Sequence, residues 1–202
     1  MNMDMSKTNV SEKTAKVIRI VTVAPIMAAI LLALLIWQFP DSFRDPFDIT
    51  VSILFLVVFP LLAYPLQPLI PKFKDKGREG QRNLAIIFAL FGYVFAVIFA
   101  LFRNPASGVW IIYLTYLISA LFIALFNKVI GLKASGHSCG VAGPVWTLIW
   151  FLGAKALFGL IFLVAVYWAS IKTRRHKPVE LLAGTLIPAL SLVISIVIIH
   201  FA

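Results

Sequence analysis

The sequence predicts an all-α integral membrane protein, a bundle of about seven transmembrane helices. Hydrophobic residues make up 61% of the 202 residues and charged residues only 13%, whereas a soluble globular domain is about 45–50% apolar. The apolar residues gather into runs close to the length of about 20 residues that a bilayer-spanning helix needs. The basic residues stand mainly between these runs, as they do in membrane proteins.

Taken in order, the apolar runs place seven spans along the chain. The first run follows a segment with four basic residues, but it is too long for the core of a signal peptide and no small-residue cleavage site follows it. We therefore expect residues 1–16 to be a cytoplasmic segment and residues 17–202 to form a single transmembrane helical domain. The predicted spans are residues 17–39, 49–69, 84–102, 108–126, 139–153, 155–170 and 181–201.

The fifth and sixth spans are short, and they could instead form one helix of about 30 residues with Lys155 at its middle. An isolated lysine at the bilayer centre costs about 2.5–3.5 kcal/mol on insertion scales. With seven spans and a cytoplasmic N-terminus, 15 of the 18 Lys and Arg residues lie on the cytoplasmic side, and Arg44, Arg103 and Lys155 lie outside. One fused helix would leave 11 inside and 6 outside, a weaker positive-inside bias. The sequence therefore favours seven spans in the cell membrane, with the C-terminus outside.

Two of the predicted cytoplasmic loops hold more basic residues than orientation requires. Residues 71–83, PKFKDKGREGQRN, and residues 170–180, SIKTRRHKPVE, also mix acidic residues among the bases. Because cytoplasmic loops of membrane proteins are ordinarily basic, the net charge of +10 needs no nucleic acid partner. Each loop is open to two interpretations, as a topology signal or as an anion site.

Residues suited to chemistry are expected to meet at the cytoplasmic boundary. His137 and His176 lie in predicted cytoplasmic loops, and Glu180 follows His176 by four positions. His200, near the C-terminus, is interpreted as a helix cap or an interfacial residue. The predicted spans contain no Asp or Glu, so an ion relay inside the membrane has no obvious carrier. The loops expected on this face are residues 71–83, 127–138 and 171–180. Two membrane crossings separate each of these loops from the next.

Three segments form an ordered set of motifs. They read KDKGREGQRN at 74–83, KASGHSCGVAGP at 133–144 and WASIKTRRHKPVELLAG at 168–184. The second resembles the P-S-G-H motif of the type 2 phosphatidic acid phosphatase (lipid phosphate phosphatase) family, and the third resembles that family's S-R-x-x-x-x-x-H-x-x-x-D motif. The first is similar to a degenerate form of the family's K-x-x-x-x-x-x-R-P motif. The resemblance, to a small prokaryotic member, covers about residues 50–201.

The resemblance implies a six-helix phosphatase-like core plus one helix, and hydrolysis of a lipid phosphate or isoprenoid (di)phosphate through a phosphohistidine, without a metal or another cofactor. It implies that His176 is the nucleophile and that Glu180, where the family has Asp, orients the His176 ring. His137 would be the general acid for the leaving group. The phosphate would be bound by Lys76, Arg78, Arg82, Ser135, Gly136, Arg174 and Arg175.

The chain departs from the family pattern around the second and third motifs. Ala169 and Ser170 stand where the family has Ser-Arg, so a phosphate-binding arginine is missing, and Ala134 replaces Pro. Arg174 or Arg175 would have to substitute for it. Without a substitute, the transition state would lose a charge clamp of a kind typically worth about 10²–10³ in rate, which would make the protein slow, specialised or inactive.

Two other classes of function remain open. One is an inactive family member that binds or flips polyprenyl or lipid phosphates. The other is a small transporter subunit, which would need a polar pocket near the membrane midplane, and the spans offer only scattered polar residues such as Thr115 and Thr147. The expected partners are a lipid or isoprenoid phosphate substrate and membrane lipids, and the oligomeric state is not predicted. The single cysteine, Cys139, excludes an intramolecular disulfide and a cysteine-cluster metal site.

Overall fold

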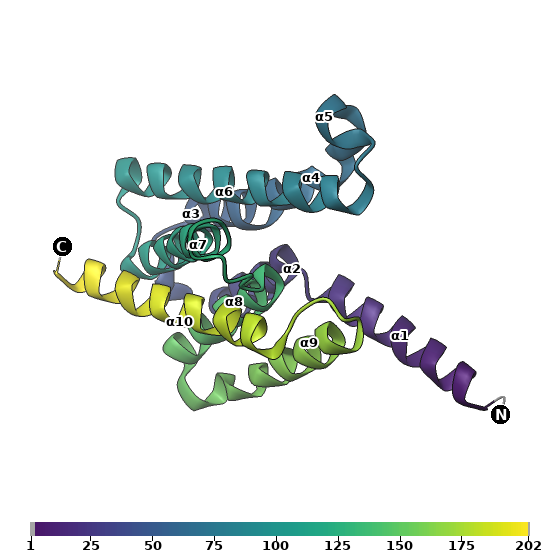
Figure 1. Ribbon diagram of the computed structural model, residues 1–202. Helices are drawn as coiled ribbons and strands as arrows, with labels where there is room; N and C mark the ends of the chain where they lie inside the picture. The colour runs from purple at the N-terminus through teal and green to yellow at the C-terminus, as the bar shows by residue number, and fades with distance from the viewer. Residues whose placement is uncertain (1–2, 202) are drawn as a thin grey trace.

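The chain folds into a bundle of helices, seen in a computed structural model (Figure 1). The structure describes residues 3–201, although it does not describe the side chains of residues 3–9 and of Arg78, and within this range all regular secondary structure is helical. The α-helices are α1 (Met3–Val21), α2 (Ala24–Gln38), α3 (Pro46–Ile53), α4 (Phe59–Leu66), α5 (Pro71–Lys74), α6 (Gly77–Arg103), α7 (Ser107–Leu125), α8 (Gly136–Leu152), α9 (Leu160–Lys172) and α10 (Pro178–Phe201). Short 3₁₀ or π segments are η1 (Pro40–Ser42), η2 (Leu54–Val58), η3 (Gln67–Leu69), η4 (Phe126–Ile130) and η5 (Gly153–Gly159).

Long apolar helices dominate the described part of the chain. By length and composition, five of its helical stretches could cross a membrane, and six if the bent pair of α1 and α2 is counted as one span. They suggest a multi-pass membrane protein, as the sequence predicts. The five stretches are Pro46–Leu69, Glu79–Arg103, Ser107–Ile130, Gly136–Lys172 and Pro178–Phe201.

The first predicted span, residues 17–39, is not one straight helix. The chain bends by 56° between Val10–Val21 and Ala24–Gln38. Pro25 stands at the start of α2, where its missing N–H and fixed φ are tolerated, whereas inside a continuous helix it would remove a hydrogen bond. In addition, α1 runs through the boundary predicted between residues 16 and 17, so no helix end separates the two predicted regions.

The chain reverses direction between α8 and α9. Val145 of α8 and Val166 of α9 share one buried cluster, and a methyl group on Gly159 would lie 3.3 Å from the Val145 side chain. In one straight helix, residues 145 and 159 would be about 21 Å apart, at about 1.5 Å per residue. Lys155 therefore lies in the turn η5, and the two short predicted spans are separate helices that pack against each other.

Helix α8 lies in the middle of the bundle, where it packs against α2, α7, α9 and α10 (Figure 1). Its approach to α2 is close, because a methyl group on Gly140 would lie 2.6 Å from the side chain of Ala24. The N-terminus of this central helix comes out where α1 and α9 end and where α10 begins. Four helix ends thus meet in one place.

Candidate functional site

His176 and Glu180 form a hydrogen-bonded pair at the start of α10. Helix α9 ends at Lys172, and Pro178 opens α10, so Glu180 lies in the first turn. The Glu180 Oε2 atom lies 2.7 Å from Nδ1 of His176 and also accepts from the Lys177 backbone N–H at 3.3 Å. A carboxylate accepts but does not donate, so the ring proton of His176 is on Nδ1. The lone pair of Nε2 is then available for reaction.

Residues 135–137 are held against this pair. The Ser135 N–H donates to the Glu180 carbonyl at 2.8 Å, and the Ser135 side chain caps α8 by accepting from the Ser138 N–H at 3.2 Å. On α10, a methyl group on Gly184 would overlap the carbonyl oxygen of Ser135. Glycine at position 184 therefore allows α10 and the loop before α8 to approach each other closely.

His137 contacts the end of α1. Its Nε2 atom lies 3.0 Å from the Thr22 hydroxyl, which itself lies 2.6 Å from the Ile18 carbonyl oxygen. A hydroxyl has one proton, and the carbonyl can only accept it. We infer that His137 donates from Nε2 to Thr22. The bend after α1 thus sets the orientation of the His137 ring.

A second contact from α1 reaches the end of α9. The Arg19 guanidinium donates to the Ser170 hydroxyl at 2.8 Å. Arg19 is half-buried and Ser170 is buried. In the sequence, Arg19 is only one of the basic residues that indicate topology, and Thr22 is not a candidate, because neither residue belongs to a local motif. The contacts join positions 151 and 115 residues apart, and no local sequence pattern indicates them.

The surroundings of His137 are positively charged. His137 is close enough to Arg19 and to His176 for their charges to act on it, and Arg19 is likewise close to Arg175. The charge of Lys133 also acts on Glu180. Among the described side chains, Glu180 is paired with His176, and the other ion pair joins helices elsewhere in the bundle. This arrangement favours an anion beside the two histidines.

The residues predicted to bind phosphate fall into two groups. Ser135 is buried, whereas Gly136 is exposed, and a methyl group added there would meet nothing within 4 Å. Arg174 and Arg175 are exposed in the loop after α9. Arg174 has φ 50°, the left-handed conformation that commonly ends a helix. These four residues lie around the two histidines.

The other predicted phosphate ligands lie at the start of α6, with Lys76 just before the helix and Arg78 and Arg82 in its first two turns. Helix α5 packs against η3 and α6, and the Gln67 side chain links this region by donating to the Phe73 and Gly77 carbonyls. Lys76 and Arg82 are exposed, and the Arg78 side chain lies outside the described residues. No described hydrogen bond or ion pair connects Lys76 or Arg82 to the histidines. Their convergence with His137 stays a prediction.

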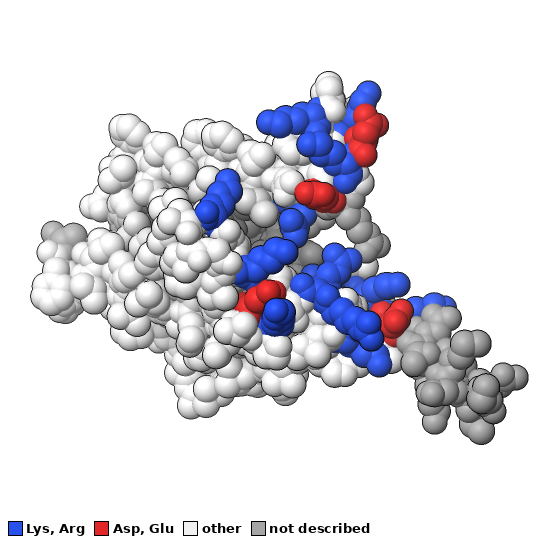
Figure 2. Space-filling view, in the orientation of Figure 1, with Lys and Arg blue, Asp and Glu red and all other residues white. Residues whose placement is uncertain are grey.

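Basic side chains cover one part of the surface shown in Figure 2. They gather over α5 and the start of α6, and again where α1, α9 and α10 meet, while the part of this face toward the C-terminus shows almost no charge. This asymmetry agrees with the predicted grouping of basic loops on one side.

A buried polar network lies below the histidines. Thr185 of α10 contacts the Ser138 hydroxyl of α8 at 3.2 Å and the Tyr167 hydroxyl of α9 at 2.9 Å. The Trp146 indole N–H donates to the Thr185 carbonyl at 3.0 Å. Three helices are tied together beneath the site, which makes it a rigid support.

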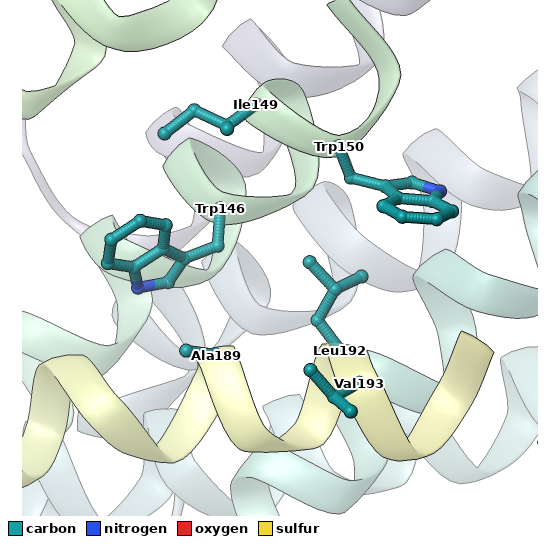
Figure 3. A pocket seen from close by; sticks show the side chains of 6 residues that line it. All are labelled: Trp146, Ile149, Trp150, Ala189, Leu192 and Val193. Carbon is teal, nitrogen blue, oxygen red and sulfur yellow. The ribbon is translucent and has the colours of Figure 1, made fainter. Parts of the chain in front are cut away.

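A shallow apolar hollow of about 210 Å³ opens between α8 and α10 (Figure 3). Trp146 and Trp150 flank it on α8, and Ala189 and Val193 line it on α10. A second hollow, of about 330 Å³, lies at the η5 end of the molecule and includes Lys155. Among the described residues, no group of three or more His, Cys, Asp or Glu side chains could hold a metal ion.

No family model, curated protein or solved structure matches this chain.

Proposed function

We propose that this chain is a membrane phosphatase that hydrolyses a lipid phosphate or an isoprenoid (di)phosphate through a phosphohistidine. The observation that supports this proposal best is the 2.7 Å pair of His176 and Glu180, joined through the Ser135 backbone to the loop that holds His137. A nucleophile, a group that orients it and a second proton-transfer group within one cationic site are what covalent phosphoryl transfer requires.

In the first step, the Nε2 lone pair of His176 attacks phosphorus and the bond from phosphorus to the leaving oxygen breaks. His137, protonated once the negative charge of the bound substrate offsets the cations around it, gives its proton to that oxygen, which leaves as an alcohol or a phosphate. In the second step, water attacks phosphorus, His137 takes a proton from the water, and the phosphorus–nitrogen bond breaks. The products are inorganic phosphate and the dephosphorylated group, and both histidines return to their initial states.

An apolar chain on the substrate fits the hollow between α8 and α10. Trp146 follows His137 by nine positions along α8, a rise of about 14 Å and about two and a half turns, so a lipid tail would pass round α8 from His137 to reach this hollow (Figure 3). Trp150, at its edge, is 53% exposed. The outward faces of other helices also hold exposed apolar side chains, such as Ile161 and Val164 at 70%, which suit contact with membrane lipids.

The proposed membrane arrangement has seven crossings, with the histidines on the cytoplasmic side and Lys155 on the other. The reversal of the chain at η5 supports it, because Lys155 and the loop after α9 then lie at opposite ends of the α8–α9 hairpin. Single cysteines introduced at positions 155 and 175, in a Cys139→Ser background, should react with a membrane-impermeant reagent from opposite sides. Labelling of both from the same side would contradict the arrangement.

Turnover tests the enzymatic proposal directly. The purified protein is assayed for phosphate release from phosphatidic acid, phosphatidylglycerophosphate and a polyprenyl diphosphate, together with His176→Ala. His200→Ala is the matched control, because His200 lies at the far end of α10. We expect release by the wild type and by His200→Ala and none by His176→Ala. Activity that survives in His176→Ala would exclude the phosphohistidine mechanism.

Binding or flipping of lipid phosphates is the second candidate. It is favoured by Ser170, which replaces the arginine of the resembled motif and leaves a clamp missing from that segment. If the protein is a binder, the wild type releases no phosphate. It would still bind phosphate-bearing vesicles, and this binding would weaken when Arg175 is replaced.

A further inference from the structure

Arg19 is anchored without a carboxylate partner. Its guanidinium donates to the Ser170 hydroxyl at 2.8 Å, and the side chain is half-buried. Within residues 10–201, Arg78 apart, no described carboxylate lies within ion-pair distance of Arg19. Removing a guanidinium partly from water without an anion is costly. The contacts that hold Arg19 in this place therefore need a reason beyond packing.

Another cationic group acts on Arg19. Arg175 is close enough for its charge to act on Arg19, and Arg19 in turn acts on His137. Thr22, one helical turn after Arg19, contacts His137 at 3.0 Å, so the guanidinium and the His137 ring are held by the same end of α1. A group of like charges next to a potential reaction centre is stabilised when an anion binds among them.

We propose that Arg19 binds a non-bridging oxygen of the substrate phosphate, an inference that rests on the proposed phosphatase function. Of the five N–H donors of a guanidinium, one goes to Ser170 and the others remain for a phosphate. Ser170 stands where the resembled third motif has its arginine. Arg19 thus brings a guanidinium from α1 to the place on α9 where the chain lacks one, and α1 becomes part of the site.

Four variants separate charge from structure. Arg19→Ala removes the side chain, and Arg19→Gln keeps a donor for Ser170 but no charge. Lys16→Ala is the control, since Lys16 is an exposed base on the same helix. Arg19→Ala combined with Ser170→Arg returns a guanidinium from α9. We expect Arg19→Ala and Arg19→Gln to lose about 10²–10³ in turnover, Lys16→Ala to match the wild type, and the double variant to recover part of the loss.

The second measurement is protection by inorganic phosphate against thermal unfolding of the purified protein in detergent. A ligand that binds the folded state raises the unfolding temperature. We expect orthophosphate to raise it for the wild type and Lys16→Ala, but much less for Arg19→Ala and Arg19→Gln. The unfolding temperatures without phosphate show whether each variant is folded.

The outcomes distinguish this inference from the function on which it rests. If the wild type is active and Arg19→Gln behaves like Lys16→Ala, the role of Arg19 is overturned and the phosphatase remains. If the wild type is inactive but phosphate protection depends on Arg19, the enzymatic proposal fails and Arg19 stands as a phosphate ligand. If the wild type is inactive and protection is absent or independent of Arg19, both are overturned.

Discussion

Glu180→Gln is the substitution that tests the His176 mechanism most sharply. Glutamine has nearly the shape of glutamate, and its carbonyl oxygen can still accept from Nδ1 of His176, so the ring can keep its orientation. The negative charge is lost. This charge matters most when Nε2 attacks phosphorus, because the ring then becomes positively charged while its Nδ1–H remains 2.7 Å from the Glu180 oxygen.

The size of the effect follows from Coulomb's law. Two unit charges about 4 Å apart, roughly the distance between the ring and carboxylate centres, attract by about 1 kcal/mol in water and about 4 kcal/mol at an effective dielectric constant of 20. The His176 and Glu180 side chains are 20% and 14% exposed, so the upper part of this range applies. About 3 kcal/mol corresponds to a fall of roughly 10²-fold in the rate of phosphorylation.

The assay is phosphate release under single-turnover conditions, with the acid-labile phosphohistidine trapped at early times. Glu180→Gln should form the intermediate about 10²-fold more slowly, and Glu180→Ala should be slower still because the ring loses its partner. Glu79→Gln, a change at an exposed acid on α6, is the control for loss of a carboxylate. If Glu180→Gln formed the intermediate within about twofold of the wild-type rate while His176→Ala was inactive, Glu180 would not stabilise the charged ring.

Three further predictions concern the same region. His137→Ala should slow release from a phosphomonoester by about 10²–10⁴ but affect a polyprenyl diphosphate less, because a phosphate leaving group needs the proton less; equal losses on both substrates would contradict its role as general acid. Gly184→Ala should lower the free energy of unfolding by about 1–3 kcal/mol, because its methyl group would overlap the Ser135 carbonyl. Thermal unfolding measures this, with Gly136→Ala as the control, and an unchanged unfolding temperature would contradict it. Arg174→Gly should raise stability by about 1 kcal/mol, because the left-handed φ of 50° costs less for glycine, and lower turnover if the side chain binds phosphate; a fall in stability would refute the backbone argument.

The sequence predicts the long helices well where strong local signals mark their ends. The span predicted at 108–126 agrees closely with α7, whose start follows Pro105 and a left-handed Asn104, and α10 begins at Pro178. The first span is wrong as a single helix because apolar content continues across Thr22. Pro25 marks the break in the sequence, and the packing of α1 against α9 and of α2 against α8 accompanies the turn.

The candidate site also has contacts that the sequence predicts and contacts that it does not. His176 and Glu180 lie within one segment, and the resemblance of that segment to the third motif implies their contact. The contact of Arg19 with Ser170 is different, because both residues look ordinary in their own segments. The convergence of the 71–83 loop with the histidines rests on topology alone, since sharing a membrane face does not fix the distance between loops.

The contacts of α1 determine when this site can form during synthesis of the chain. Thr22 and Arg19 meet residues 115 and 151 positions further along the chain, and Glu180 lies further along still, in α10. Closing such long loops is slow and entropically unfavourable, and α1 can complete these contacts only after residues up to Ser170 have been synthesised. An unfinished chain therefore keeps Arg19, His137 and His176 apart, so the proposed activity could arise only after α9 and α10 are in place.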